Sequence, residues 1–397
     1  MKKLKSDIDI AFVSTYPPSV GGIATFTEDI ITTMDYTGAV NTHVVAITKE
    51  EGYTYSNKVI AKIRQKERED YIEIARKLNQ SRINLVVIEH KFGLYGGDQG
   101  EYILDLVNYL KIPIIATLHT ILSEPTPKQK YIINVLGEKC EKLITMSHNT
   151  KEMLHTIYGV DEEKIEVIQH GVSKKEFQSK EVLKKKFGYE NRQIISTIGL
   201  IKPGKGIEDG IEAIAKVVRG NITGELKGPE HKEVLYLILG QVSPSRKEEG
   251  AAYKNKLKDL ITKYDLGKNI IFVNKYLSKD EIVQYLQLSD IYMTPYLTKD
   301  LAVSSIFAYA VGYGKAIVST PFLYAKEMLT EGNGLFAEFN DPDSIAKCIL
   351  QILDEPYKKI KMERNAMKIG RTMYWDKIAM QYTNVFLNII NAETEII

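Results

Sequence analysis

The sequence predicts an α/β protein of two doubly wound domains, and three observations support this prediction. Apolar runs of strand length alternate with segments of helical spacing, a pattern typical of parallel sheets with helical crossovers. The pattern begins again after Gly171, where a strand, a glycine-rich turn and a helix follow one another a second time. The length of 397 residues suits two domains of ordinary size.

Composition narrows the class of protein further. Hydrophobic residues make up 44% and charged residues 26% of the chain, as in ordinary globular proteins, and the net charge of +2 gives no case for a nucleic-acid partner. The two cysteines, Cys140 and Cys348, lie too far apart in the sequence to suggest a disulfide framework or a metal cluster. No run reaches the roughly 18 apolar residues of a membrane span. We therefore expect a cytoplasmic protein, with contact at the inner membrane surface as a further expectation.

The first domain is expected at residues 1–175. An apolar strand at 8–14 leads into a Pro- and Gly-rich break, and residues 23–34 have the spacing of a helix. The remaining elements follow from the same patterns: strands at 41–48, 83–89, 112–118, 142–147 and 165–169, and helices over the charged segment 58–77 and at 101–110. The mixed charges of 58–77, like the run Lys184–Lys186, indicate either a solvated helix face or contact with an anionic lipid or acidic glycan.

The second domain is expected at residues 176–371, after a boundary between 171 and 192. Its strands are predicted at 193–199, 234–240, 269–274, 290–294, 316–319 and 334–338, with helices from about 207 and at 280–288. Residues 372–397, which contain the single tryptophan Trp375, have helical spacing. Ligands of doubly wound sheets bind outside the carboxyl ends of the strands, so the loops there are the candidate functional segments.

Two of these loops combine glycines with the start of a helix. Gly21 and Gly22 follow the first strand, where backbone N–H groups could bind an anionic group, although an ordinary strand-to-helix turn is an equal alternative. The segment 199–206 adds two lysines, Lys202 and Lys205, to three glycines. It predicts a diphosphate-binding loop, with a charged surface turn as the alternative.

Hydroxyl and imidazole groups complete the candidate residues. Ser304 and Ser305 lie near the start of a helix, where they would bind phosphate or serve only as an N-cap. His90 and His119 each stand at the end of a predicted strand, where an imidazole can hydrogen-bond a sugar hydroxyl or a phosphate oxygen. The segment 91–98, rich in Gly and aromatic residues, suits the face of a sugar. His170, at the domain boundary, is interpreted as structural.

Taken together, these segments resemble glycosyltransferase family 4, nearly from end to end. The resemblance rests on the Gly21-Gly22 loop, the Lys205-Gly206 turn, and the segments 117–120, 167–172 and 307–320 with Glu327 after them. It implies the GT-B fold, in which two Rossmann-like domains face each other across a cleft. It also implies retaining transfer from a nucleoside diphosphate sugar, and a last helix that crosses back to the first domain.

The resemblance also implies roles for individual residues. Lys205 matches the lysine that binds the donor diphosphate, His119 matches a histidine near the donor sugar, and Gly21 and Gly22 match the loop beside the diphosphate. We expect His119 and His90 to be catalytic. The donor-binding residues are then expected to be Gly21, Gly22, Lys202, Lys205, Ser304, Ser305 and Glu327.

Three positions depart from the family pattern. An arginine often follows the glycine that ends the strand, but Leu200 stands here, and Lys202 could supply the charge. Two glutamates with seven residues between them are replaced by Lys299 and Phe307. Segments 90–97 and 304–310 resemble a divergent branch that also lacks the glutamates and is described as mannosyltransferase-like, which favours GDP-mannose.

The sequence therefore predicts a hexosyltransferase that uses a nucleotide-sugar donor and a glycan or lipid-linked acceptor. No cofactor and no metal are expected, because we identify no Asp-x-Asp motif at a suitable strand end; the motif Asp7 to Asp9 lies at the start of a strand. Two alternatives stay open. One is a sugar phosphorylase or epimerase of the same fold, and the other is a catalytically inactive subunit that binds a nucleotide sugar.

Overall fold

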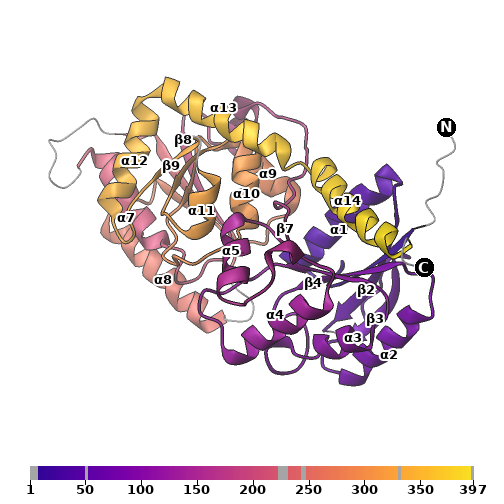
Figure 1. The fold of residues 1–397 in the computed structure, drawn as a ribbon. Helices are drawn as coiled ribbons and strands as arrows, with labels where there is room; N and C mark the ends of the chain where they lie inside the picture. The colour runs from indigo at the N-terminus through magenta and orange to yellow at the C-terminus, as the bar shows by residue number, and fades with distance from the viewer. Residues whose placement is uncertain (1–7, 50–51, 222–230, 243–246, 330–331, 395–397) are drawn as a thin grey trace. The chain divides into compact units, whose positions relative to one another are not determined.

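The computed structural model describes residues 8–49, 52–221, 231–242, 247–329 and 332–394 (Figure 1). The described residues form two compact units, one within Met1–Ser173 and Met373–Ile397 and the other within Lys174–Thr372. Each unit is built on one parallel β-sheet with helices packed against it. The predicted α/β class and its two doubly wound parts are confirmed.

The sheet of the first unit has seven parallel strands in the order β3-β2-β1-β4-β5-β6-β7. The strands are β1 (Asp9–Ser14), β2 (Asn41–Thr48), β3 (Val59–Arg64), β4 (Leu85–His90), β5 (Ile114–Leu118), β6 (Lys142–Thr145) and β7 (Ile165–Val167). Every residue of β1, β4 and β5 is buried, as expected for strands with helices on both faces. The strand order reverses between β1 and β4, so the loops after these strands diverge and leave room for a ligand.

Helices cover both faces of this sheet. Figure 1 shows α1 and α14 on one side and α2, α3 and α4 on the other. The helices are α1 (Gly22–Thr37), α2 (Arg68–Asn79), α3 (Ile103–Tyr109), α4 (Pro127–Lys139), α5 (His148–Thr156) and α14 (Trp375–Thr394), with short 3-10 turns at Asp98–Gly100 and Glu162–Lys164. Local sequence signals explain where some of these helices begin and end. Thr126 and Gln129 form a capping box at the start of α4, and Gly38 ends α1 in the left-handed conformation.

The predicted helix over 58–77 is wrong in its first half. Residues Val59–Arg64 form strand β3 at the edge of the sheet, and only the second half of the segment is helical, as α2. Ile63 is buried while its neighbours Lys62 and Arg64 are exposed, which is the alternation of a half-buried strand. Lysine and arginine on an edge strand also oppose pairing with other chains. Their charges made the segment look helical.

The last helix belongs to the first unit and is fixed there by its tryptophan. Trp375 N donates to the Val172 carbonyl at 3.2 Å, and α14 packs against α1. The indole ring lies directly against Gly171, where a Cβ atom would approach its carbons to 2.3 Å. A side chain at residue 171 would therefore displace the tryptophan.

Gly171→Ala is expected to destabilise the protein by about 1–3 kcal/mol, because an added methyl group in a filled core displaces its neighbours. The measurement is denaturant unfolding followed by tryptophan fluorescence, which reports the single indole. Gly93→Ala is the matched control, since nothing lies within 4 Å of a Cβ at that position. Equal effects of the two substitutions would contradict the argument.

The second unit is built on six parallel strands in the order β10-β9-β8-β11-β12-β13. They are β8 (Gln193–Ile198), β9 (Val234–Leu239), β10 (Ile270–Val273), β11 (Ile291–Thr294), β12 (Ala316–Ser319) and β13 (Gly334–Phe336). Each lies within a strand predicted from the sequence. The order reverses between β8 and β11, which places a second candidate ligand position at the carboxyl ends of these two strands.

The helices of this unit cover the apolar faces of its sheet. They are α6 (Lys180–Phe187), α7 (Ile207–Arg219), α8 (Lys247–Lys263), α9 (Lys279–Leu288), α10 (Ser305–Gly312), α11 (Leu323–Met328), α12 (Pro342–Asp354) and α13 (Pro356–Thr372). Capping side chains determine where two of these helices begin. Ser278 and Glu281 form a capping box at the start of α9, and Asp341 caps the start of α12. Among the helices in the described ranges, none has both the length and the apolar character needed to cross a membrane.

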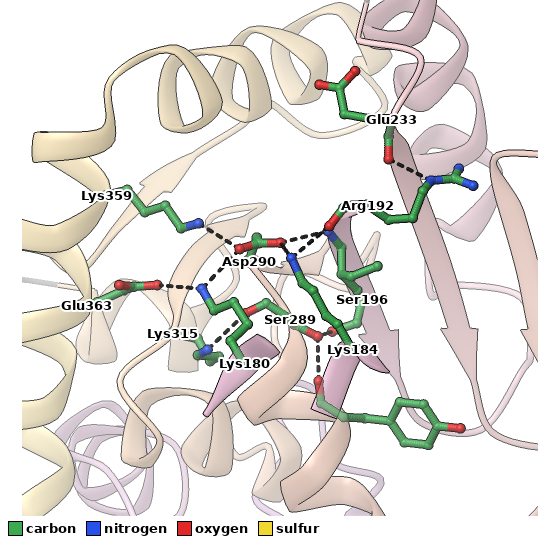
Figure 2. A network of polar contacts seen from close by, with 12 residues as sticks. Lys180, Lys184, Arg192, Ser196, Glu233, Ser289, Asp290, Lys315, Lys359 and Glu363 are labelled. Atoms are coloured by element: carbon green, nitrogen blue, oxygen red, sulfur yellow. Dashed lines mark hydrogen bonds and ion pairs between the residues drawn. The ribbon is translucent and has the colours of Figure 1, made fainter. Parts of the chain in front are cut away.

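A cluster of lysines surrounds one carboxylate at the amino end of β11. Asp290 accepts from Lys180 at 3.0 Å, Lys184 at 2.7 Å and Lys359 at 2.9 Å, and from the backbone N–H of Ile194 at 2.9 Å (Figure 2). These side chains come from α6 and α13, so one carboxylate joins two helices to the sheet. A fourth lysine nearby, Lys315, donates to the Ser289 carbonyl, and burial lowers its pKa to about 7.

Candidate active site

Two histidines lie next to each other at the carboxyl edge of the first sheet. His90 is the last residue of β4, and it pairs in register with Leu118 of β5. His119 follows directly, and its backbone N–H donates to the His90 carbonyl at 2.9 Å. Their predicted position at two strand ends is confirmed, while the catalytic role assigned to them stays a prediction.

The His119 ring is held by a buried carboxylate that the sequence analysis missed. Glu89, the neighbour of His90 in β4, accepts from His119 Nε2 with its Oε2 at 2.6 Å. Its side chain is 0% exposed and that of His119 is 10% exposed. Because a carboxylate only accepts, Nε2 carries the proton, and in the neutral ring Nδ1 is left as an acceptor. A glutamate directly after the apolar run 85–88 of a predicted buried strand was the available signal, since a buried carboxylate requires a partner.

An aromatic ring of α1 packs against the other side of His119. Phe26 of α1 meets the imidazole edge to face, with ring centroids 4.9 Å apart. The same phenyl ring contacts His170 at 5.3 Å and Trp375 of α14 at 5.1 Å. His170 Nδ1 donates to the Gly171 carbonyl at 2.8 Å, and burial lowers its pKa to about 4, so it is a neutral packing residue, as expected. His119 is therefore positioned both by a hydrogen bond and by packing.

His90 lies deeper than His119. Its ring is fully buried, stacked on Tyr95 at 6.0 Å and edge-on to Phe92 at 5.1 Å. Within the described part of the chain, neither of its ring nitrogens has a hydrogen-bond partner. Burial, with a smaller contribution from His119, lowers the pKa of His90 to about 3, so the ring is neutral at physiological pH. The predicted contact of His90 with a ligand stays a prediction.

The paired glycines stand where α1 begins. Gly21 precedes the helix without a side-chain cap, and Gly22 is its first residue. Nothing lies within 4 Å of a Cβ built on either glycine. Packing among the described residues therefore gives no reason for glycine at these positions. Close approach of a ligand to the backbone, beside the start of a helix, would give one.

In the second unit, the 199–206 loop lies between β8 and α7 and is fixed against the loop after β11. Gly206 has φ +60°, and a Cβ there would lie 1.7 Å from the Pro295 carbonyl oxygen. Leu297 N donates to the Gly204 carbonyl at 3.0 Å. Both the backbone conformation and the close approach require glycine at 206. The loop thus brings the start of α7 to the carboxyl edge of this sheet.

Lys205 rests on an aromatic stack. Its ammonium lies 3.7 Å from the centroid of Tyr296, which stacks on Phe322 at 5.3 Å. Phe322 in turn meets Phe307 of α10 at 5.4 Å. The ring face attracts the ammonium and holds it at the end of β11. Tyr296 was missed from the sequence because only the fold brings it under Lys205. Lys202, three residues earlier, is exposed.

The other predicted donor residues lie on neighbouring helices of the same unit. Ser304 is the N-cap of α10, and its Oγ accepts from the Phe307 N–H at 3.4 Å, while Ser305 is the first residue of that helix. Glu327 is half-buried on α11, whose start is fixed by a hydrogen bond from Leu323 N to the Lys299 carbonyl at 2.9 Å. The structure shows Ser304 as an N-cap, and phosphate binding by Ser304 and Ser305 stays a prediction.

The positions of the two replaced glutamates serve packing in this chain. Phe307 is fully buried and meets the rings of Phe322 and Tyr324 edge to face. The Lys299 ammonium lies over the ring of Phe339 at 5.4 Å. Neither position offers a carboxylate to a ligand. In the described ranges, no group of three or more His, Cys, Asp or Glu side chains could hold a metal ion.

Two parallel-sheet units, each with glycine-rich loops and polar side chains at the carboxyl ends of its strands, match the GT-B class of proteins. The sequence matches the family described as Glycosyltransferase Family 4 over residues 20–176 and the one described as Glycosyl transferases group 1 over residues 178–370. The chain belongs to glycosyltransferase family 4, which confirms the resemblance seen in the sequence.

Individual relatives agree with this family. An uncharacterised glycosyltransferase of Methanocaldococcus jannaschii is 22% identical, with 94% of this chain and 96% of the relative covered. A GDP-mannose-dependent monoacylated alpha-(1-6)-phosphatidylinositol monomannoside mannosyltransferase of Corynebacterium glutamicum is 21% identical over 65% of each protein. The crystal structure of a glycosyltransferase from Rickettsia africae covers 96% of this chain and 98% of its own, with a TM-score of 0.75 at 17% identity, a likeness of fold.

Proposed function

We propose that this chain is a retaining hexosyltransferase that uses a nucleoside diphosphate sugar, with GDP-mannose as the first donor to test, and a glycan or lipid-linked acceptor. The observation that carries the proposal is Lys205, held on Tyr296 beside a glycine-rich loop and the start of α7. A fixed ammonium and a helix N-terminus together suit a diphosphate. The GDP-mannose-dependent relative supports the choice of donor and of a lipid-linked acceptor.

In this reaction the bond between the anomeric carbon and the diphosphate oxygen breaks, and the acceptor hydroxyl oxygen forms the new bond on the same face of the sugar. The acceptor proton leaves with the nucleoside diphosphate or passes to water. Negative charge grows on the leaving diphosphate, where Lys205, Lys202 and the helix starts at Ile207 and Ser305 would stabilise it. These groups supply the electrostatic stabilisation without a metal ion.

His119 has a separate role in the proposal. Its Nε2–H is occupied by Glu89, so Nδ1 is the ring atom left for the donor sugar. An accepting Nδ1 would bind a sugar hydroxyl and orient the ring for attack at the anomeric carbon. Gly21 and Gly22 would give the diphosphate close access to the backbone at the start of α1.

A thermal-shift screen against GDP, UDP, ADP and their sugar derivatives tests the donor class. A ligand that binds only the folded state raises the melting temperature, by the equivalent of about 2.7 kcal/mol at a hundredfold excess over its Kd. GDP and GDP-mannose are expected to give the largest shift. A larger shift with UDP compounds would overturn the choice of base, and no shift with any nucleotide would overturn the proposed function.

Lys205→Ala is expected to lower kcat about 10- to 100-fold, less than the loss of a sole electrostatic group, because Lys202 and two helix starts share the charge of the diphosphate. The measurement is turnover with the donor that the screen identifies. Lys268→Ala, which removes an exposed lysine of the same unit, is the control. Unchanged turnover in Lys205→Ala would show that the diphosphate binds elsewhere.

One observation favours a second function. Phe307 is buried where a donor-binding glutamate stands in many family members, so this chain lacks that carboxylate. A subunit that binds a nucleotide sugar without transferring it would tolerate this loss. A thermal shift with a nucleotide sugar, but no turnover across a broad panel of acceptors, would support this function over the transferase.

A further inference from the structure

The exposed face of α13 carries positive charges and no negative ones. Apart from the first and last residues of the helix, its exposed positions hold one aromatic, one aliphatic and four basic side chains, namely Tyr357, Ile360, Lys361, Arg364, Lys368 and Arg371. At 3.6 residues per turn, these six positions fall within about 100° of the helix circumference. Figure 1 shows α13 at the surface of the second unit. Its last four exposed residues, Lys361 to Arg371, therefore form a continuous basic stripe about 15 Å long.

The opposite face fixes α13 to the second unit. Its buried residues are Met362, Ala366 and Gly370. A Cβ atom at Gly370 would lie 2.6 Å from the Gly312 carbonyl oxygen, so the helix packs closely on α10. Lys359, on the same buried side, donates to the Asp290 carboxylate at 2.9 Å (Figure 2). The basic stripe is therefore held in place by a packed helix.

The charges of the basic stripe are not compensated. In the described ranges, none of its four cations forms an ion pair with a carboxylate. The helix has one acidic residue, Glu363, which faces the buried side and lies 3.7 Å from Lys180. Residues 330–331 are outside the described ranges, and counting Glu331 in full against the stripe still leaves three positive charges. Such an excess attracts an anionic surface.

The basic stripe differs from the other charged helix faces of the chain. A solvated face usually carries both signs of charge, with pairs between them. The exposed face of α2 is of this kind, because it holds glutamates beside its cations, and Lys77 pairs with Glu73 at 2.6 Å. The charges of α2 therefore favour a solvated face, whereas those of α13 favour an anionic partner.

Two apolar side chains at the start of α13 indicate which anionic partner fits. Tyr357 is 90% exposed and Ile360 is 45% exposed, and both lie in the same sector of the helix as the basic stripe. Tyrosine rings and aliphatic side chains enter the interfacial region of a bilayer, while lysine and arginine bind its anionic headgroups. A nucleic acid would make no use of an aliphatic side chain beside its phosphates, and the net charge of +2 gives the whole chain no general attraction to it.

We infer that this face of α13, from Tyr357 to Arg371, docks on a membrane surface that carries anionic lipid. The basic stripe lies against the headgroups, and Tyr357 and Ile360 enter the interface at one end of it. The inference goes beyond the proposed transferase function and does not depend on it, because it involves neither the loop of Lys205 nor His119. Docking would bring the chain to the surface where a lipid-linked acceptor is found.

The test is co-sedimentation of the full chain with vesicles of phosphatidylcholine, either alone or with about 30% phosphatidylglycerol. Binding to the anionic vesicles alone is expected, and added salt should weaken it. Lys361→Gln combined with Lys368→Gln is expected to weaken this binding about 25-fold, because each cation near an anionic membrane contributes a factor of about five. Tyr357→Ser should weaken binding without changing its dependence on salt, since it removes no charge.

Lys258→Gln combined with Lys268→Gln is the matched control, because both lysines are exposed in the same unit and lie outside α13. All four lysines are exposed, so the variants should fold as the parent does. Equal losses in the two double variants, equal binding to neutral and anionic vesicles, or no binding to either would overturn the inference. Tighter binding of polyuridylate than of the anionic vesicles would identify a nucleic-acid surface and overturn the membrane assignment. The nucleotide thermal shift tests the transferase separately, because no vesicle is present in it.

Discussion

Glu89→Gln is expected to lower kcat for sugar transfer on the order of 10³-fold, by the same reasoning that applies to carboxylates that orient a catalytic histidine. Glutamine removes the negative charge that holds the proton on Nε2, and its amide NH2, when turned toward the ring, donates where the carboxylate accepted. His119 Nε2 would then become the acceptor and Nδ1 would carry the proton. Because Phe26 packs against the imidazole, the ring would stay in place with its donor and acceptor exchanged.

Three measurements separate this effect from simple loss of structure. The nitrogen chemical shifts of His119 report which ring atom carries the proton, and they should exchange in Glu89→Gln. KM for the donor should change less than kcat if the imidazole acts mainly in the transition state. The double variant Glu89→Gln, His119→Ala should be no slower than His119→Ala alone, because the two residues act as a unit. Additive losses would show that Glu89 acts independently of His119.

Most of the fold could be predicted from the sequence because both sheets are parallel and buried. Strands covered on two faces are continuous apolar runs, and the crossovers between them have helical spacing, so β1, β4 and β8 stand out clearly. The edge strand β3 could not be recognised in the same way. One side of it is solvated, and Lys62 and Arg64 supply charges that are equally typical of an exposed helix.

The candidate site was predictable only in part. Glycines and lysines in loops after strands can be recognised locally, which is why Gly206 and Lys205 were identified. The partners that position these groups come from distant segments. Glu89 meets His119 thirty residues later, and Tyr296 lies under Lys205 across two loops. Such pairs depend on strand order, which local patterns do not contain.

The largest expected effect on stability concerns Asp290. Its carboxylate is 8% exposed and lies within 3.0 Å of three lysine ammonium groups. Burial alone would raise the pKa of this carboxyl, but the charges of Lys180, Lys359 and Lys184 outweigh it and hold the pKa well below its usual range. The carboxylate is therefore what allows three positive charges from two helices to share one partly buried space (Figure 2).

Asp290→Asn is expected to destabilise the protein by about 3 kcal/mol, since removing one member of a buried charge cluster leaves the others uncompensated. Asparagine keeps the size of the side chain and can still accept from the Ile194 N–H. The decrease in the free energy of unfolding therefore measures the effect of removing the negative charge. Denaturant unfolding at pH 7 measures it. Asp280→Asn, which removes a 68% exposed partner of Lys175, is the control and should cost less than about 1 kcal/mol.

The pH dependence of this loss has a defined sign. A carboxyl whose pKa is lowered by folding stabilises the folded state fully above its unfolded pKa of about 3.9, and loses that contribution as the pH falls toward the folded value. The contribution of the Asp290 carboxyl to the difference between the parent protein and Asp290→Asn should thus be constant from pH 8 to pH 5, and a change near pH 7 would report Lys315, whose pKa is lowered to about 7 by burial and is partly restored by the Asp290 charge. Below pH 4 the contribution of the carboxyl should shrink by up to about 1.4 kcal/mol per pH unit.

Adding Lys359→Met to Asp290→Asn should recover part of the stability, because it removes one of the three uncompensated charges. A double variant less stable than Asp290→Asn would show that Lys359 stabilises α13 through its packing rather than through Asp290.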